Sequence, residues 1–143
     1  MNKKEPSKAA GNPLRRFNLP KSQILRGRRN FENLFSSSSF LSASTVNLRY
    51  AIYPNASGEL LVGFIAPKKI GNAVKRIRAK RFLREAYRLN QHIITDSPEL
   101  SKMCLHFVFM AKHANLTFND VQHDVIQLMT KLREQLLSET SPL

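Results

Sequence analysis

Residues 60–88 read LLVGFIAPKKIGNAVKRIRAKRFLREAYR, and the pattern of apolar residues changes in the middle of this stretch. From 60 to 66 apolar side chains occupy every second position, which is typical of a strand with one buried face. Pro67 ends that pattern, and residues 73–89 are good helix formers preceded by Asn72, a favourable N-cap. We therefore expect a strand that leads directly into a long helix.

The flanking sequence predicts the remaining elements. Apolar spacing indicates a short helix around 31–35, strands around 40–43, 46–52 and 103–111, and a capping box at 117–120 that starts a last helix. The turn-forming residues 55–58 favour a β-hairpin between strands 46–52 and 60–66. The element order is then α-β-β-β-α-β-α, an α+β single domain with helices packed on a mostly antiparallel four-stranded sheet.

Length and composition agree with one modest domain and a tail. The chain has 143 residues and 42% hydrophobic content. Residues 1–20 combine Pro and Gly with basic residues and lack apolar periodicity, so we expect a disordered basic tail, a domain over 21–138 and a flexible C-terminus over 139–143. The longest apolar run, around 103–111, is about half of a membrane span, and the N-terminus lacks the apolar core of a signal peptide. A cytoplasmic protein is expected.

The positive charge is concentrated in the first two-thirds of the chain. The formal net charge is +13, yet residues 1–88 hold 19 basic and 4 acidic residues, net +15, while residues 89–143 are net −2. Nine of the 21 residues from 68 to 88 are basic, and Glu85 is the only acid among them. Such a local excess indicates a polyanionic partner.

A helical projection places most of this charge on one side of the predicted helix. Lys80, Arg84, Arg88, Arg81 and Arg78 share one arc, opposite an apolar side. A solvated surface helix normally mixes both signs, and like charges at i, i+4 cost ~0.2–0.5 kcal/mol per pair, so a binding function should offset them. The free N–H groups of the first turn, beside nearby lysines, add a phosphate-binding arrangement.

Residues that could carry protein-based chemistry are sparse. The four histidines have no spacing that gathers metal ligands, the single cysteine Cys104 lies in an apolar strand, and no nucleophile motif is present. We therefore expect no catalytic side chains and no metal held by the protein.

The quoted stretch is similar to the signature of the bacterial ribonuclease P protein component: a strand with Gly, then Lys-Lys-x-Gly-x-Ala-Val, an Arg-Asn-Arg element, Lys-Arg and a further Arg. The resemblance implies the fold of the second domain of ribosomal protein S5. It also implies a subunit that binds a catalytic RNA and the 5′ leader of precursor tRNA and assists leader removal. The resemblance further implies that the RNA performs the hydrolysis, with Mg²⁺ bound by that partner RNA, and that neither a small-molecule cofactor nor a membrane takes part.

The resemblance and the charge pattern together nominate site residues. The expected RNA-binding residues are Lys68, Lys69, Asn72, Lys75, Arg76, Arg78, Lys80, Arg81, Arg84 and Arg88. The family's leader-binding cleft between the sheet and the first helix falls on Phe31, Phe35 and Tyr50. The family's Arg-Asn-Arg element appears here as Arg76-Ile77-Arg78, so one polar contact with RNA is expected to be lost at position 77.

Other interpretations stay open from the sequence. A structural RNA-binding protein of the ribosomal type, without a role in cleavage, would have the same composition and fold class. A peripheral membrane protein could use the basic helix on anionic lipid if its apolar side were free to insert. Phe31 and Phe35 at helical spacing, and Tyr50 in a strand, are also what a plain core would contain.

Overall fold

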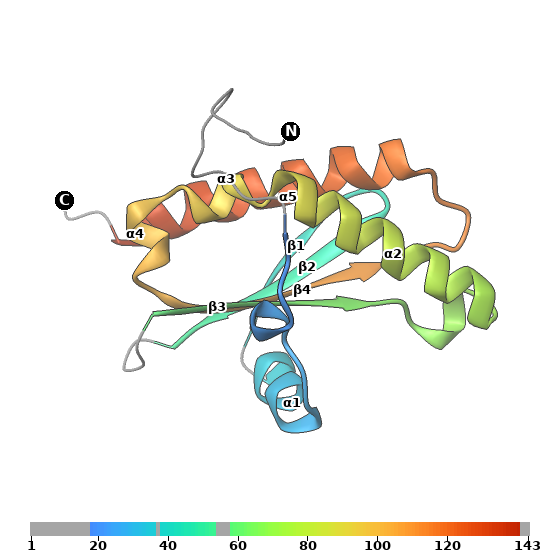
Figure 1. The fold of residues 1–143 in the computed structure, drawn as a ribbon, viewed down its shortest axis with the longest axis horizontal. Helices are drawn as coiled ribbons and strands as arrows, with labels where there is room; N and C mark the ends of the chain where they lie inside the picture. Colours follow the sequence, from blue (N-terminus) through green and yellow to red (C-terminus); the bar gives the residue numbers. More distant parts are fainter. Residues whose placement is uncertain (1–17, 37, 54–57, 141–143) are drawn as a thin grey trace, which may run out of the picture.

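The computed structural model describes residues 18–36, 38–53 and 58–140, which form one sheet with helices on both faces (Figure 1). Residues 1–17 and 141–143, which include most of the expected tail and C-terminus, lie outside the described residues. The elements in chain order are η1 (Lys21–Gln23), α1 (Arg28–Ser36), β1 (Ser39–Ser42), β2 (Val46–Ile52), β3 (Glu59–Ile65), η2 (Lys68–Ile70), α2 (Ala73–Asn90), α3 (His92–Thr95), α4 (Pro98–Ser101), β4 (Cys104–Ala111) and α5 (Phe118–Thr140).

The sheet has the strand order β1-β2-β4-β3. β2 is antiparallel to both β1 and β4, whereas β3 runs parallel to β4. β4 is the most buried strand, with six of its eight residues buried, as expected of a strand that is covered on both faces. The predicted α+β domain with a mostly antiparallel four-stranded sheet is therefore confirmed.

The predicted hairpin between β2 and β3 is wrong, because β4 lies between these two strands. The tight connection joins β1 to β2 instead, where the Ala43 N–H donates to the Val46 carbonyl oxygen at 2.9 Å. A local turn signal carries no information about a later strand. β4 is apolar on both faces and must bury both, so it lies inside the sheet, paired with β2 on one side and β3 on the other. A direct β2–β3 pairing would have excluded it from this position.

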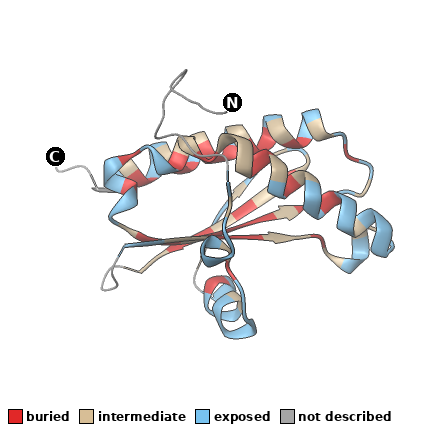
Figure 2. Ribbon diagram, in the orientation of Figure 1, coloured by how far each residue is buried: buried red, intermediate tan, exposed pale blue. Residues whose placement is uncertain are grey.

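The parallel pairing of β3 and β4 requires a crossover, and α2 is its main element. α2 and α5 lie side by side over one face of the sheet, where Figure 2 shows their buried sides turned toward the strands. The large core lies between these two helices and the sheet, and its fully buried side chains include Leu48, Leu83, Tyr87, Phe107, Phe109, Leu128 and Leu132.

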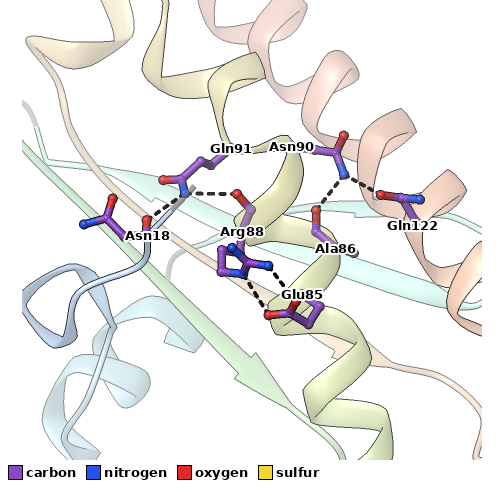
Figure 3. A network of polar contacts seen from close by, with 7 residues as sticks. All are labelled: Asn18, Glu85, Ala86, Arg88, Asn90, Gln91 and Gln122. Carbon is purple, nitrogen blue, oxygen red and sulfur yellow. Dashed lines mark hydrogen bonds and ion pairs between the residues drawn. The ribbon is translucent and has the colours of Figure 1, made fainter. Parts of the chain in front are cut away.

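The end of α2 is held by a set of side-chain hydrogen bonds (Figure 3). Buried Gln91 donates through Nε2 to the carbonyl oxygens of Asn18, at 2.8 Å, and of Arg88, at 3.0 Å. Asn90 donates through Nδ2 to the Gln122 Oε1 of α5 at 3.0 Å. These bonds tie α2 both to the segment before η1 and to the neighbouring helix, so the orientation of α2 over the sheet is fixed.

A smaller cluster attaches α1 to the opposite face of the sheet. Leu34 of α1 is fully buried there with Leu25, Ala51 and Val108. A Cβ atom at Gly63 of β3 would lie 2.5 Å from Val108 Cγ2 and 3.1 Å from the Phe31 ring. Glycine at this position therefore lets the first helix approach the sheet closely.

We predict that Gly63→Ala lowers the free energy of unfolding by about 1–3 kcal/mol, because the added methyl group overpacks the contact between Val108 and Phe31. Urea denaturation measures this loss. The double variant Gly63→Ala with Val108→Ala should lose less free energy of unfolding than the sum of the two single variants, since Val108→Ala removes the methyl group that clashes with the new Cβ. A Gly63→Ala protein as stable as the wild type would contradict the packing described for α1.

Candidate nucleic-acid interface

The start of α2 has the predicted cap. Asn72 is extended, and its Oδ1 accepts a hydrogen bond from the Lys75 N–H at 3.0 Å. This bond satisfies one of the free donors of the first turn, and the partial positive charge of the helix N-terminus lies beside the exposed side chains of Lys69 and Lys75. The entrance to α2 is therefore positive in both its backbone and its side chains.

α2 divides into a buried and an exposed side, as the projection predicted (Figure 2). Ala79, Leu83, Ala86 and Tyr87 are buried against the sheet, and burial raises the pKa of the Tyr87 hydroxyl. The exposed side carries Arg78, Lys80, Arg81 and Arg84. The apolar side that membrane insertion would need is therefore covered by the protein's own sheet, and among the described helices none is long and apolar enough to span a bilayer.

A groove of about 610 Å³ runs along the β3 edge of the sheet, between α2 and the chain that precedes α1. The wall opposite α2 is the segment that contains Leu25. The Leu25 N–H donates to the Val62 carbonyl oxygen of β3 at 2.8 Å, so this segment extends the sheet at its β3 edge. The groove is lined by Ile24, Leu25, Arg26, Gly27, Phe31, Phe64, Ile77, Lys80, Arg81 and Arg84. It thus combines four cationic side chains with an apolar floor, which is the composition that holds a nucleic-acid strand by its phosphates and its bases.

Ile77 occupies an unexpected place in this groove. It is 62% exposed and lies on the wall beside Lys80 and Arg81. A branched apolar side chain there offers van der Waals contact to a base or ribose in place of the hydrogen bonds of an amide.

A second hollow, of about 400 Å³, lies at the start of α2. Lys69 and Lys75 meet Lys112 and His113 there, and the latter two come from the connection between β4 and α5. The Nζ atom of Lys112 donates to the Ala43 carbonyl oxygen at 2.9 Å, which anchors this lysine beside the hollow. Sequence reasoning missed Lys112 and His113, because only the folded sheet brings that connection next to α2.

The predicted RNA-binding cations differ in the contacts that their charged groups make within the protein. Arg88 binds both carboxylate oxygens of Glu85, at 2.9 and 2.8 Å, and this hydrogen bonding lowers the pKa of the Glu85 carboxyl. Arg76 donates through Nε to the Ala66 carbonyl oxygen at 3.3 Å. The guanidinium of Arg78 stacks 5.1 Å above the centre of the Phe82 ring. Arg88 is the most strongly neutralised of the three.

Aromatic and cationic groups form a ladder on the α1 side of the sheet. The rings of Phe31 and Phe35 are stacked with centroids 6.3 Å apart. The guanidinium of Arg49 lies 5.6 Å from the Phe35 centroid and 5.0 Å from the Phe40 centroid. Phe35 and Phe40 are 39% and 49% exposed, and Phe31 also lines the groove. The groove therefore continues into an exposed stacking surface, which we call the aromatic ladder (Phe31, Phe35, Arg49 and Phe40).

The structure does not bring Tyr50 to this surface. Its side chain lies on the opposite face of the sheet, in the large core with Val46 and Leu48, and is only 4% exposed. The physical reason is the two-residue period of a strand, which gives Tyr50 the same orientation as Val46 and Leu48. The same period turns Arg49 toward α1, next to its cross-strand partner Phe40. Strict use of the alternation in β2 would have indicated Arg49 from the sequence.

Comparisons with known proteins agree on one family. The profile of the family described as Ribonuclease P matches residues 19–133. The chain is 28% identical over 128 residues to the ribonuclease P protein component of Syntrophus aciditrophicus, covering 88% of this chain and 100% of that protein. It is 32% identical over 97 residues to that of Porphyromonas gingivalis strain ATCC 33277, covering 66% and 70%.

Solved structures show the same fold. The RNase P protein of Staphylococcus aureus at 2.0 Å superposes with a TM-score of 0.61 at 16% identity, covering 79% of this chain and 96% of that one. The RNase P protein from Thermotoga maritima gives a TM-score of 0.60 at 21% identity, covering 76% and 96%.

Proposed function

Because the chain belongs to the ribonuclease P family, we propose that it is the protein subunit of the endoribonuclease that removes 5′ leaders from precursor tRNA. In this proposal, the cationic face of α2 and the hollow at its start bind the catalytic RNA. The aromatic ladder binds the single-stranded leader. The observation that carries the proposal is the continuity between the groove and the ladder, which share Phe31.

The cations supply electrostatic attraction for RNA. Lys80, Arg81 and Arg84 are exposed along one wall of the groove, and Arg26 faces them from the opposite wall. A strand within the groove would therefore meet positive charge on both sides. Arginine presents a planar fork that matches phosphate oxygens, and the apolar floor accommodates the base.

The aromatic ladder supplies stacking without base-specific hydrogen bonds. Unpaired RNA bases stack on aromatic rings and on guanidinium planes, and every base has a face that can do so. The alternation of Phe35, Arg49 and Phe40 offers such planes in succession. This arrangement suits leaders of varied sequence, which a processing enzyme must accept.

We assign the bond-breaking step to the RNA, with Mg²⁺ held by RNA phosphates. The protein's contribution is to offset the repulsion between two polyanions, the catalytic RNA and the precursor tRNA, which Mg²⁺ would otherwise have to screen. The protein should therefore matter most when Mg²⁺ is scarce. A ribosomal-type protein without a role in cleavage is not favoured, since the matching family profile describes ribonuclease P and the curated relatives compared above are ribonuclease P protein components.

We predict that the full chain restores cleavage of precursor tRNA by the catalytic RNA at a low Mg²⁺ concentration at which the RNA alone is inactive. The logarithm of the RNA-binding constant falls linearly with the logarithm of the salt concentration. Replacing Lys80, Arg81 and Arg84 together by Ala should reduce the slope of that line by about three, one for each lost cation. Arg88→Ala should change it much less, because Glu85 already neutralises that charge. Filter binding at several salt concentrations and a cleavage time course measure both effects.

Failure of the wild-type protein to stimulate cleavage would overturn the proposed function. If Arg88→Ala reduced the salt dependence of RNA binding as much as the triple variant does, the groove cations would not be the main RNA contacts. Circular dichroism of each variant separates a loss of binding from a loss of folding.

We also predict that Phe35→Ala and Phe40→Ala each weaken binding of precursor tRNA by about 1–3 kcal/mol, since each removes a stacking plane. Mature tRNA without a leader should bind all variants alike. Tyr50→Phe is the matched control, because Tyr50 lies in the core and its substitution should leave leader binding unchanged. Equal losses for precursor and mature tRNA would show that the aromatic ladder does not hold the leader.

A further inference from the structure

Three side chains that can bind metal ions meet where β3 and β4 begin. Glu59 is the first residue of β3 and pairs in register with Cys104, the first residue of β4. His106 follows Cys104 by two residues, so both side chains point to the same face of the sheet. Glu59 and His106 are 47 positions apart in the chain, and only the parallel pairing brings them together.

The donor atoms of these residues converge on one point. His106 Nε2 lies 3.2 Å from Glu59 Oε1 and 3.9 Å from Cys104 Sγ, and all three donor atoms lie within 4.8 Å of one another. Both neighbours approach the same ring nitrogen. A proton relay of the Cys-His-acid type uses the two different nitrogens of the imidazole, so this arrangement is that of a chelate rather than a nucleophile and its base.

The distances suit a small tetrahedral ion. Zinc bonds of about 2.0 Å to nitrogen or oxygen and 2.3 Å to sulfur place the ligand atoms of a tetrahedral site roughly 3.5 Å apart. Glu59 is exposed and can rotate to close the remaining difference, while Cys104 and His106 are held by the strand. Sulfur and imidazole ligands select zinc-like ions over Mg²⁺, which prefers oxygen ligands.

The Glu59 carboxylate lies beside the Cys104 thiol and the His106 ring, so a positive ion at this point would have an anionic ligand. The Tyr53 ring packs 4.8 Å from the His106 ring and covers one side of the site. The Tyr53 hydroxyl is shielded from solvent and has no hydrogen-bond partner among the described residues, so the residue that covers the site carries an unused polar group.

We propose that Glu59, Cys104 and His106 bind one zinc-like divalent ion through three protein ligands. The ion would link the first residues of β3 and β4, the two parallel strands that the crossover through α2 connects. Its role would then be to stabilise the pairing of these two strands, and it is separate from the Mg²⁺ assigned to the RNA. The proposal rests on the geometry of the sheet and is independent of the proposed function.

Titration of the RNA-free full chain with Co²⁺ tests this site directly, because a cobalt–thiolate bond gives a charge-transfer absorption band. We expect one Co²⁺ per chain with that band, displaced by Zn²⁺. Cys104→Ser should abolish the band, and His106→Gln and Glu59→Gln should each weaken binding by at least about tenfold. His123→Gln is the matched control, because His123 is exposed on α5 away from the cluster.

Glu59→Gln keeps the test decisive if Cys104→Ser fails to fold, because Glu59 is exposed and its replacement leaves the buried residues in place. Zn²⁺ should raise the thermal unfolding temperature of the wild type and of His123→Gln, and raise that of Glu59→Gln less. Absence of a thiolate band in the wild type would overturn the proposal. A band of unchanged affinity in both His106→Gln and Glu59→Gln would equally overturn it, since the cysteine would then bind alone.

Discussion

The parallel pairing of β3 with β4 is the constraint on which the other features of this protein depend. Two parallel neighbours cannot be joined by a tight turn, so the chain must leave the sheet and return across its face. α2 is the main element of that return, and its apolar side must cover the sheet. Its cations are therefore directed away from the core and over the β3 edge, where the segment from Ile24 to Gly27 completes a groove.

This arrangement explains how one helix can carry so much charge of one sign. Repulsion between like charges on α2 costs a few tenths of a kcal/mol per pair, whereas burial of one Leu or Tyr side chain contributes about 1.5–3 kcal/mol. The buried side of α2, with Leu83 and Tyr87, therefore outweighs the repulsion in the free protein. The hydrogen bonds of Asn90 and Gln91 hold its end in place. The charge on the other side stays exposed to solvent, as the proposed RNA binding requires.

Local physical chemistry made much of the fold predictable. The Asn72 cap, the buried side of α2 and the Thr117 cap of α5 follow from neighbouring residues and appear in the structure, with the Asp120 N–H donating to Thr117 Oγ1 at 3.1 Å. The strand order did not follow, because a turn signal between β2 and β3 carries no information about β4. The predicted hairpin failed for that reason.

Part of the candidate site was likewise predictable from the sequence, and part was not. The cations of α2 could be named because they lie on one continuous helix. Phe40 and Lys112 come from a separate strand and a separate connection, and only the sheet brings them beside the predicted residues, whereas the alternation in β2 would have indicated Arg49. Tyr50 was assigned to the leader-binding cleft from the family resemblance, although its position in β2 turns its side chain into the core. The convergence of Glu59 with His106 likewise depends on a register that no local pattern encodes.

In the proposed complex, RNA lies in the groove between α2 and the segment before α1. Photo-cross-linking of the full chain to catalytic RNA that carries 4-thiouridine, followed by mass spectrometry of the linked peptides, identifies the residues next to the RNA. We expect cross-links in peptides that contain Arg26, Phe31 and residues 77–84, and few in α5. Cross-links concentrated on α5, with the groove peptides unmodified, would contradict this placement of the RNA.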